Sequence, residues 1–348
     1  MPSAADAVRS AIAGSGGALR FDRYLDEILY GPAGFYTSGG AAGRRGDFIT
    51  SPEVGPLFGA LLARAIDSWW IELGRPADFR VFDMGAGPGT LARSILAAAP
   101  EALGEPSRYV AVETSAAQRA RHPDGIVSVP ELPEGELSGV VIANELFDNL
   151  PFRLLVFDDG WREAWVVLSG EPSEILRPLD TRPPVALPPV AALGARVPWQ
   201  ERAGDLVTDV LDRLDGRLVV IDYAVPTTAE LVSRPWREWL RTYAGQERGG
   251  HYLRRVGEQD VTNDVCIDQL VAVVGEPDAL RTQAQFLGRW GIDELVDEGR
   301  RVWEAEAARP GLRAMRMRSR ISEAAALLDP NGLGAFMVLE WRGRRRAR

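Results

Sequence analysis

The chain has 348 residues, 46% of them hydrophobic, so it can bury a sizeable core in one large domain or two. Acidic residues outnumber basic ones by 49 to 40, which argues against a nucleic-acid-binding protein, because such proteins neutralise phosphates with a basic excess. The sequence contains no lysine, and this excludes Schiff-base enzymes and P-loop proteins. One cysteine, Cys266, and two distant histidines, His122 and His251, lead us to expect no metal site.

The sequence gives no sign of a membrane segment or of a secretion signal. No stretch approaches the ~20 apolar residues that a membrane helix needs. Asp6 comes early, and the apolar run from Val8 to Ile12 is too short for the core of a signal peptide. We therefore expect a cytoplasmic protein without membrane insertion.

Hydrophobic periodicity divides the chain into two regions. Residues 1–75 have the pattern of a mostly helical region that contains a glycine-rich loop and a helix over 57–73. In residues 76–348, short apolar strands alternate with helices, which favours a Rossmann-like α/β domain with a parallel sheet. Its strands are expected at 79–84, 109–112, 126–129, 139–143, 218–221 and 335–341, and its helices at 90–99, 265–274, 286–296 and 312–328.

Two segments interrupt this alternation and are expected to be insertions, at about 152–215 and 225–262. The first contains a β-hairpin pattern over 154–168 with an Asp-Asp-Gly turn. A proline-rich stretch, 172–198, follows and is expected to be irregular loop. The second insertion is rich in Arg, Gly and Trp.

The strongest local signal is an apolar strand followed by three alternating glycines, Gly85, Gly87 and Gly89, and then a helix. Glycine lets the backbone turn sharply and approach a ligand closely. Ligands of such sheets bind at the carboxyl ends of the strands. The glycines alone also fit a simple tight turn. Glu113 ends the next strand, where an acid can hydrogen-bond both hydroxyls of a ribose, and the combination favours a nucleotide-type ligand.

The glycine spacing distinguishes between two such ligands. A dinucleotide site has the pattern G-x-G-x-x-G, with a helix N-terminus facing a pyrophosphate. Here the pattern is Asp-x-Gly-x-Gly-x-Gly, and Asp83 precedes the first glycine. S-adenosylmethionine (SAM) has no phosphate but carries a methionine ammonium, which such an acid can help to hold. We therefore predict SAM as the cofactor and disfavour an NAD-dependent oxidoreductase.

Polar residues also follow the fourth expected strand, whose end faces the same crevice. Asn144, Glu145 and Asp148 can position a nucleophile opposite the methyl group of SAM. Methyl transfer is an in-line displacement that depends on alignment and desolvation. Asn144 as the N-cap of a helix is the alternative interpretation.

A further polar stretch, residues 46–53, follows a run of glycines. Such a loop can fold over a site. It also fits the start of a helix, with Ser51 as the cap and Pro52 in the first turn.

These motifs in this order resemble the MidA-like SAM-dependent methyltransferases, whose mitochondrial members are complex I assembly factors. The resemblance runs along nearly the whole chain. It rests on residues 24–36, 46–53, 58–59, 83–89, 143–151, 221–223, 260–262, 283–287 and 333–336. It implies a class I methyltransferase fold, with a mostly parallel seven-stranded sheet and an added helical region. For the mitochondrial members it implies symmetric dimethylation of an arginine on a respiratory complex I subunit, and hence a protein substrate.

The resemblance also assigns residues to the cofactor. The residues that would bind SAM are Asp83, Gly85, Gly87, Gly89 and Glu113. Gly46 and Asp47 would close the site.

Asn144, Glu145 and Asp148 would face the acceptor. A guanidinium has a pKa of about 12.5–13.8, so a side chain does not readily deprotonate it. Carboxylates can instead orient it by paired hydrogen bonds. The carboxylates expected in this role are Glu145, Asp148 and Glu53.

Three positions depart from the family pattern. Asp264 stands where a histidine is usual, Cys266 where an acid is usual, and Pro88 where an arginine is common. Because of Asp264 and Cys266, two alternative functions stay open: methyl transfer to a small molecule, and a SAM-binding assembly factor with little catalysis.

Overall fold

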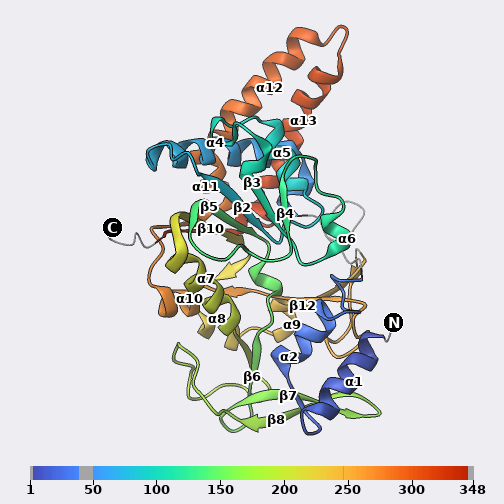
Figure 1. Cartoon of the computed structure of the whole chain (residues 1–348). Helices are drawn as coiled ribbons and strands as arrows, with labels where there is room; N and C mark the ends of the chain where they lie inside the picture. The colour runs from blue at the N-terminus through green and yellow to red at the C-terminus, as the bar shows by residue number, and fades with distance from the viewer. Residues whose placement is uncertain (1–2, 39–49, 246, 344–348) are drawn as a thin grey trace. The chain divides into compact units, whose positions relative to one another are not determined.

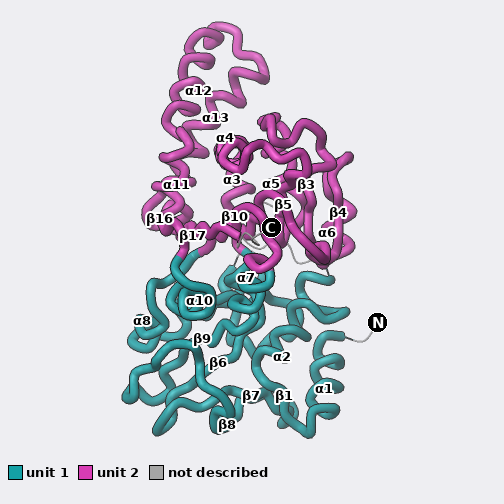
Figure 2. The backbone as a smooth tube through the Cα atoms, turned by 60° about the vertical axis from the view of Figure 1, so that its left-hand side comes forward, with its two compact units in different colours: residues 1–48, 146–209, 223–276 teal, residues 49–145, 210–222, 277–348 magenta. Residues whose placement is uncertain are grey.

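The computed structural model describes residues 3–38, 50–245 and 247–343. These residues belong to two compact units, and each unit is assembled from three segments of the chain (Figure 2). Unit 1 takes residues 1–48, 146–209 and 223–276, and unit 2 takes residues 49–145, 210–222 and 277–348.

This division differs from the boundaries expected from periodicity. The expected boundary after residue 75 falls inside unit 2. The two expected insertions, at about 152–215 and 225–262, contribute most of their length to unit 1. Unit 1 is therefore formed by segments that are far apart in the sequence.

Unit 2 is built on a seven-stranded sheet. Its strands are β2 (Arg80–Met84), β3 (Tyr109–Val112), β4 (Val127–Val129), β5 (Leu137–Asn144), β10 (Leu214–Asp222), β16 (Ala279–Thr282) and β17 (Met337–Arg342). Their order is β16-β17-β10-β5-β2-β3-β4. Strands β10, β5, β2, β3 and β4 pair in parallel, and β17 pairs antiparallel with β10 and β16. A seven-stranded, mostly parallel sheet is thus confirmed.

Helices accompany this sheet and share a core with it (Figure 1). The α-helices of unit 2 are α3 (Ser51–Val54), α4 (Pro56–Glu72), α5 (Thr90–Ala97), α6 (Ala116–Arg119), α11 (Gln283–Arg289), α12 (Ile292–Glu306) and α13 (Leu312–Leu327). Helix α4 begins at a proline, whose missing N–H is not needed in a first turn. Its apolar residues recur every three or four positions, so one face packs in the core. The strands are apolar on successive residues because helices cover both faces of such a sheet.

One expected helix, 286–296, is in fact two. Helix α11 ends at Arg289, and α12 begins at Ile292 and packs against α13. Gly291 lies between them with a φ of 82°, a left-handed conformation that interrupts the helix and that glycine adopts without strain. Periodicity continues across such a break, so the pattern alone could not place it.

The described residues of unit 1 form three sheets. The largest is antiparallel and contains β1 (Leu19–Arg20), β6 (Arg153–Phe157), β7 (Trp161–Ser169), β8 (Glu171–Pro178) and β9 (Arg196–Trp199). The others pair β11 (Ala224–Val225) with β15 (Val265–Cys266), and β12 (Leu240–Ala244) with β13 (Glu247–Arg248) and β14 (Asp260–Asn263). The α-helices are α1 (Ala4–Gly14), α2 (Phe21–Leu25), α8 (Thr228–Val232), α9 (Trp236–Trp239) and α10 (Ile267–Val274). Helix α7 (Glu201–Arg213) starts in unit 1, and its last residues belong to unit 2.

The hairpin expected over 154–168 is confirmed as β6 and β7. The proline-rich stretch 172–198 was wrongly expected to be irregular throughout, because its ends form most of β8 and β9. Both strands pair on one side only, with β7 and with β6 respectively. An edge strand tolerates proline, since the missing N–H falls on the unpaired side.

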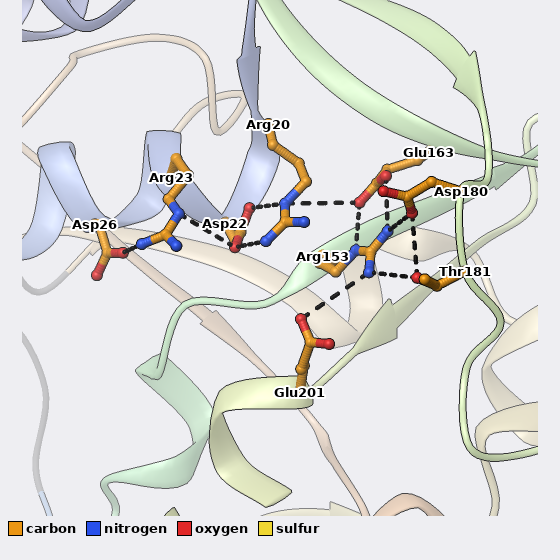
Figure 3. A network of polar contacts seen from close by, with 9 residues as sticks. All are labelled: Arg20, Asp22, Arg23, Asp26, Arg153, Glu163, Asp180, Thr181 and Glu201. Atoms are coloured by element: carbon orange, nitrogen blue, oxygen red, sulfur yellow. Dashed lines mark hydrogen bonds and ion pairs between the residues drawn. The ribbon is translucent and has the colours of Figure 1, made fainter. Parts of the chain in front are cut away.

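A buried ion pair connects the strands of the large sheet in unit 1 (Figure 3). Arg153 on β6 binds Glu163 on β7 through Nε at 2.5 Å and Nη2 at 2.9 Å, and only about 3% of either side chain is exposed. Asp180 accepts a further bond from Arg153 at 2.9 Å. The guanidinium also lies 3.9 Å from the centre of the Trp199 ring on β9. The pair therefore joins three neighbouring strands.

In the part of the chain that the structure describes, no helix is both long enough and apolar enough to cross a membrane.

We expect Arg153→Ala to destabilise the protein by up to about 3–5 kcal/mol, because the buried Glu163 would lose its bidentate partner and keep only Arg20, whose Nε lies 4.0 Å away. Arg162→Ala is the control on the same hairpin. Arg162 pairs with Asp158 at 3.7 Å, and the two side chains are 41% and 50% exposed, so its loss should cost about 0–1 kcal/mol. Urea unfolding of the two variants measures the difference. Equal effects would contradict a dominant role for the buried pair.

Candidate functional site

The loop after β2 is built on glycines in left-handed conformations. Gly85, Gly87 and Gly89 have φ values of 69°, 53° and 77°, which other residues rarely adopt. Gly89 precedes the first residue of α5, and a Cβ atom there would come within 3.0 Å of the Pro123 side chain. The backbone N–H groups of Gly85 and Ala86 both donate to the carbonyl of Val112, at 2.9 and 3.1 Å. The turn is therefore fixed to the end of β3.

Glu113 follows that anchor point and reaches back to the loop. Its Oε2 accepts a hydrogen bond from the Gly87 N–H at 3.0 Å, and its Oε1 accepts one from the Ser115 N–H at 2.7 Å. The carboxylate expected to bind a ribose thus lies against the glycine loop. A loop N–H and an acid at the end of a neighbouring strand are brought together as the motif spacing predicted.

Asp83 is buried inside unit 2 directly before the loop. Its carboxylate accepts a hydrogen bond from the Tyr109 hydroxyl on β3 at 2.8 Å. Burial raises the pKa of Asp83 to about 7, the charge of Glu113 adds to the rise, and the Tyr109 bond opposes it. The acid is therefore held at the end of β2 by a hydrogen bond from the neighbouring strand.

Asn144 and Glu145 lie at the end of β5. Glu145 has a φ of 51°, a conformation that is strained for a residue with a side chain. Its N–H donates to Ile221 of β10 at 2.8 Å. Its Oε1 accepts hydrogen bonds from the Ser51 N–H at 3.0 Å and from Asn144 Nδ2 at 3.2 Å. The N-cap interpretation of Asn144 is wrong, because the residue ends a strand and the next short helix begins at Phe147.

Glu53 lies in α3, which begins at Ser51 close to the expected helix start. Its Oε1 accepts a hydrogen bond from Thr90 Oγ1 at 2.6 Å. Thr90 is the first residue of α5, directly after the glycine loop. Glu53 was predicted on the acceptor side, and the structure places it beside the residue that follows the loop. Two further residues predicted to close the site, Gly46 and Asp47, lie outside the described residues.

Asp148 belongs to unit 1, and its neighbours belong to the same unit. The Tyr223 hydroxyl donates a short hydrogen bond to its carboxylate, and Asn263 Nδ2 donates to its backbone carbonyl at 2.6 Å. Burial raises the pKa of Asp148 to about 6, while the Tyr223 bond and the charge of Arg241 oppose the rise. Tyr223 lies in one of the stretches on which the resemblance rests, but the role of its hydroxyl could not be read from the sequence.

The two unusual positions, Asp264 and Cys266, also lie in unit 1. Asp264 is paired with Arg241 at 2.7 Å and with Arg234 at 3.0 Å. Cys266 is buried, and burial raises the pKa of its thiol well above the ordinary value. A buried thiol with a raised pKa is chemically inert. Asp264 is instead part of a charged network.

In residues 3–38, 50–245 and 247–343, no group of three or more His, Cys, Asp or Glu side chains could hold a metal ion. A cavity of about 760 Å³ does occur in unit 2, where β10 begins and β17 ends. The glycine loop follows the other end of the parallel strands, so this cavity is separate from the candidate cofactor site. The cavity is lined by Trp69, Glu72, Leu73, Asp215, Gly216, Arg217, Asp278, Ala279, Arg281, Arg289, Glu340, Arg342 and Gly343.

Residues 61–284 match a family described as S-adenosyl-L-methionine-dependent methyltransferases, and the chain belongs to this family. It is also similar to curated proteins. The mouse protein arginine methyltransferase NDUFAF7, mitochondrial, is 27% identical over 80% of this chain and 72% of its own length. Its Drosophila melanogaster homologue is 26% identical over 60% of this chain, and the match spans 57% of that protein.

The chain is also similar to a solved structure over nearly its whole length. A COG1565 superfamily member from Burkholderia thailandensis, solved with bound S-adenosyl-homocysteine, has a TM-score of 0.81 and 29% identity. The match covers 99% of this chain and 93% of that one. The expected MidA-like family and the SAM cofactor are therefore confirmed.

The expected cytoplasmic location is not supported. The Drosophila, mouse and zebrafish relatives are all named as mitochondrial proteins, and this finding overturns it.

We expect Asp83→Asn to change how stability depends on pH. A carboxyl whose pKa rises from 3.8 to about 7 on folding stabilises the folded protein below pH 4 and loses that contribution as the pH rises through 7. Asparagine does not ionise. Relative to the parent protein, the variant should therefore gain stability between pH 4 and pH 8, by at most about 4 kcal/mol. Thermal unfolding at a series of pH values measures this, and a constant difference would contradict the raised pKa.

Proposed function

We propose that this chain transfers the methyl group of SAM to an arginine side chain of a protein. The observation that carries the proposal is the arrangement at the carboxyl ends of β2, β3 and β5. The glycine loop and Glu113 lie together there, and Glu145 follows the adjacent strand. The arginine acceptor is taken from the names of the mouse and Drosophila relatives.

The strand order supports assigning unit 2 to the class I methyltransferases. Five parallel strands continue into an antiparallel β17, which is inserted between β10 and β16. Sheets of this doubly wound type bind ligands outside the carboxyl ends of the strands. Asp83, Gly85, Gly87, Gly89 and Glu113 are our candidates for binding SAM at that place.

Glu145 is our leading candidate for orienting the acceptor. Its carboxylate is held by the Ser51 N–H and the Asn144 amide, and the left-handed backbone fixes the direction of the side chain. A carboxylate can hydrogen-bond a guanidinium and keep its positive charge away from the attacking nitrogen. Asp148 in unit 1 and Glu53 remain candidates for the same role.

In the reaction, a guanidinium nitrogen attacks the methyl carbon and the carbon–sulfur bond breaks. The electron pair of that bond stays on sulfur, which becomes the neutral thioether of S-adenosyl-homocysteine. The methylated nitrogen then releases a proton to water or to a carboxylate. Alignment of the two reactants is the main contribution of the protein, because the methyl group is already activated by the sulfonium.

The natural substrate protein remains a prediction. A respiratory complex I subunit is implied only by the family resemblance. A small-molecule acceptor is the second candidate, because Asp264 replaces the usual histidine and is paired with Arg241 and Arg234.

The first test is calorimetric titration with SAM and, separately, with NAD, followed by transfer from methyl-labelled SAM to arginine-containing peptides. We expect binding of SAM alone and label in peptides that contain arginine. The same peptides with citrulline in place of arginine are the control. SAM binding with no label in any peptide would refute the protein-arginine proposal and favour the small-molecule one.

Glu145→Gln should retain SAM binding and lower methyl transfer by about 100-fold or more, since a preorganised charge at the reacting centre is lost. Glutamine still accepts the Ser51 hydrogen bond, so the fold should persist. Glu134→Gln, an exposed change in the same unit, is the control and should be neutral. Full transfer by Glu145→Gln would remove this residue from the proposal.

A further inference from the structure

Three basic side chains bind backbone carbonyls of the glycine loop and of Glu113. His122 follows α6, and its Nε2 lies 2.9 Å from the carbonyl oxygen of Gly87. Arg93 on α5 donates to the carbonyl of Pro88 at 2.9 Å. Arg119 donates to the carbonyl of Glu113 at 2.6 Å. The backbone of the glycine loop and of Glu113 is thus held by side chains from α5, from α6 and from the residues that follow α6.

The protonation of His122 follows from its partners. A carbonyl oxygen only accepts hydrogen bonds, so Nε2 must carry a proton. Nδ1 lies 2.9 Å from Ser128 Oγ on β4. A serine hydroxyl can donate to this nitrogen. His122 therefore connects the loop to β4 through its two ring nitrogens.

Arg93 joins two segments of the chain, and we refer to Arg93 and His122 together as the clamp. Its Nη2 binds Pro88 O, and its Nη1 donates to the backbone carbonyl of Arg121 at 3.0 Å. Arg121 precedes His122, so the histidine is itself positioned by this arginine. Residues 121–122 and the glycine loop are therefore held together by two hydrogen-bonding routes, one through Arg93 and one through His122.

The orientation of the loop peptides follows from these contacts. The Gly87 carbonyl is directed to His122, whereas the Gly87 N–H is directed to the Glu113 carboxylate. Glycine has the largest conformational entropy to lose, and this loop has three. Contacts that hold it in one conformation before a ligand arrives reduce the ordering cost of binding.

We propose that His122 and Arg93 are positioning residues that hold the glycine loop ready for SAM and so set the affinity for the cofactor. Both act through loop carbonyls. The inference rests on the proposed assignment of this loop to SAM.

The test is calorimetric titration of the full chain with SAM. His122→Ala and Arg93→Ala should each raise the Kd about 3- to 10-fold, the effect of one net hydrogen bond. His122→Gln keeps an N–H donor for the Gly87 carbonyl and should restore most of the affinity. His251→Ala, which removes the other histidine of the chain, is the matched control and should leave the Kd unchanged.

Hydrogen exchange of the peptide that contains residues 84–91 gives a second measurement. Without SAM, exchange should be faster in His122→Ala and Arg93→Ala than in the parent protein or in His251→Ala. A general loss of folding would instead speed exchange throughout the chain. This readout therefore separates local loosening of the loop from unfolding.

Glu113→Ala distinguishes the ways in which the idea can fail. In one outcome, the parent protein binds SAM and Glu113→Ala binds it weakly, while His122→Ala and Arg93→Ala bind SAM and exchange hydrogen like the parent. That outcome would refute the clamp and leave the cofactor assignment in place. If the parent binds SAM and Glu113→Ala binds equally well, the assignment of the loop and the clamp fail together. Absence of SAM binding by the folded parent protein would also overturn both.

Discussion

The turn between β2 and α5 is the constraint on which the candidate cofactor site depends. Three glycines with positive φ allow the chain to leave a buried strand and enter a helix within five residues. Two N–H groups of the turn bind the carbonyl of Val112, which brings the end of β3 against it. Glu113 is the next residue, so its carboxylate meets the Gly87 N–H. A side chain at any of these glycines would strain the backbone and disturb each of those contacts.

Carboxylates gather at this end of the unit 2 sheet. Asp83, Glu113 and Glu145 end adjacent strands or follow them directly, and Glu53 binds the first residue of α5. Burial is the main cause of the raised pKa of Asp83, and the nearby charge of Glu113 adds to the rise. SAM carries a sulfonium and an ammonium, and a guanidinium acceptor is also cationic, so the charge of the region suits both partners of the proposed reaction.

The hydrophobic pattern and the turn residues of the sequence predicted those elements that short stretches of chain specify by themselves. The apolar runs became strands of the unit 2 sheet, and the Asp-Asp-Gly turn became the β6–β7 hairpin. The pattern did not predict β8 and β9, because both contain prolines, which strands tolerate at the edge of a sheet. Whether a strand lies at an edge depends on how the whole sheet is assembled. It also could not predict that Leu19 and Arg20 pair with β7, almost 150 residues later. Pairing over such distances carries no short-range signal.

The same distinction applies to the candidate site. Glu113 was predicted because a motif fixes its spacing from the glycines. The sequence suggested His122 only as a possible metal ligand. Its contact with the glycine loop was not predicted, because its partner is a backbone carbonyl 35 residues away. Any residue can supply a carbonyl, so no residue type marks the contact. Tyr109 was missed for a related reason, since a tyrosine in a strand is expected to be core until its hydroxyl is seen to bind Asp83.

The departures at 264 and 266 act on a different part of the molecule from the glycine loop. Arg241 lowers the pKa of Asp148 by its charge and lies 4.4 Å from the Tyr223 ring. Asp264 binds the same guanidinium at 2.7 Å and so partly neutralises it. The guanidinium of Arg241 therefore acts on Asp148 through its charge and is paired directly with Asp264. These contacts lie in unit 1, whereas the glycine loop and Glu113 lie in unit 2.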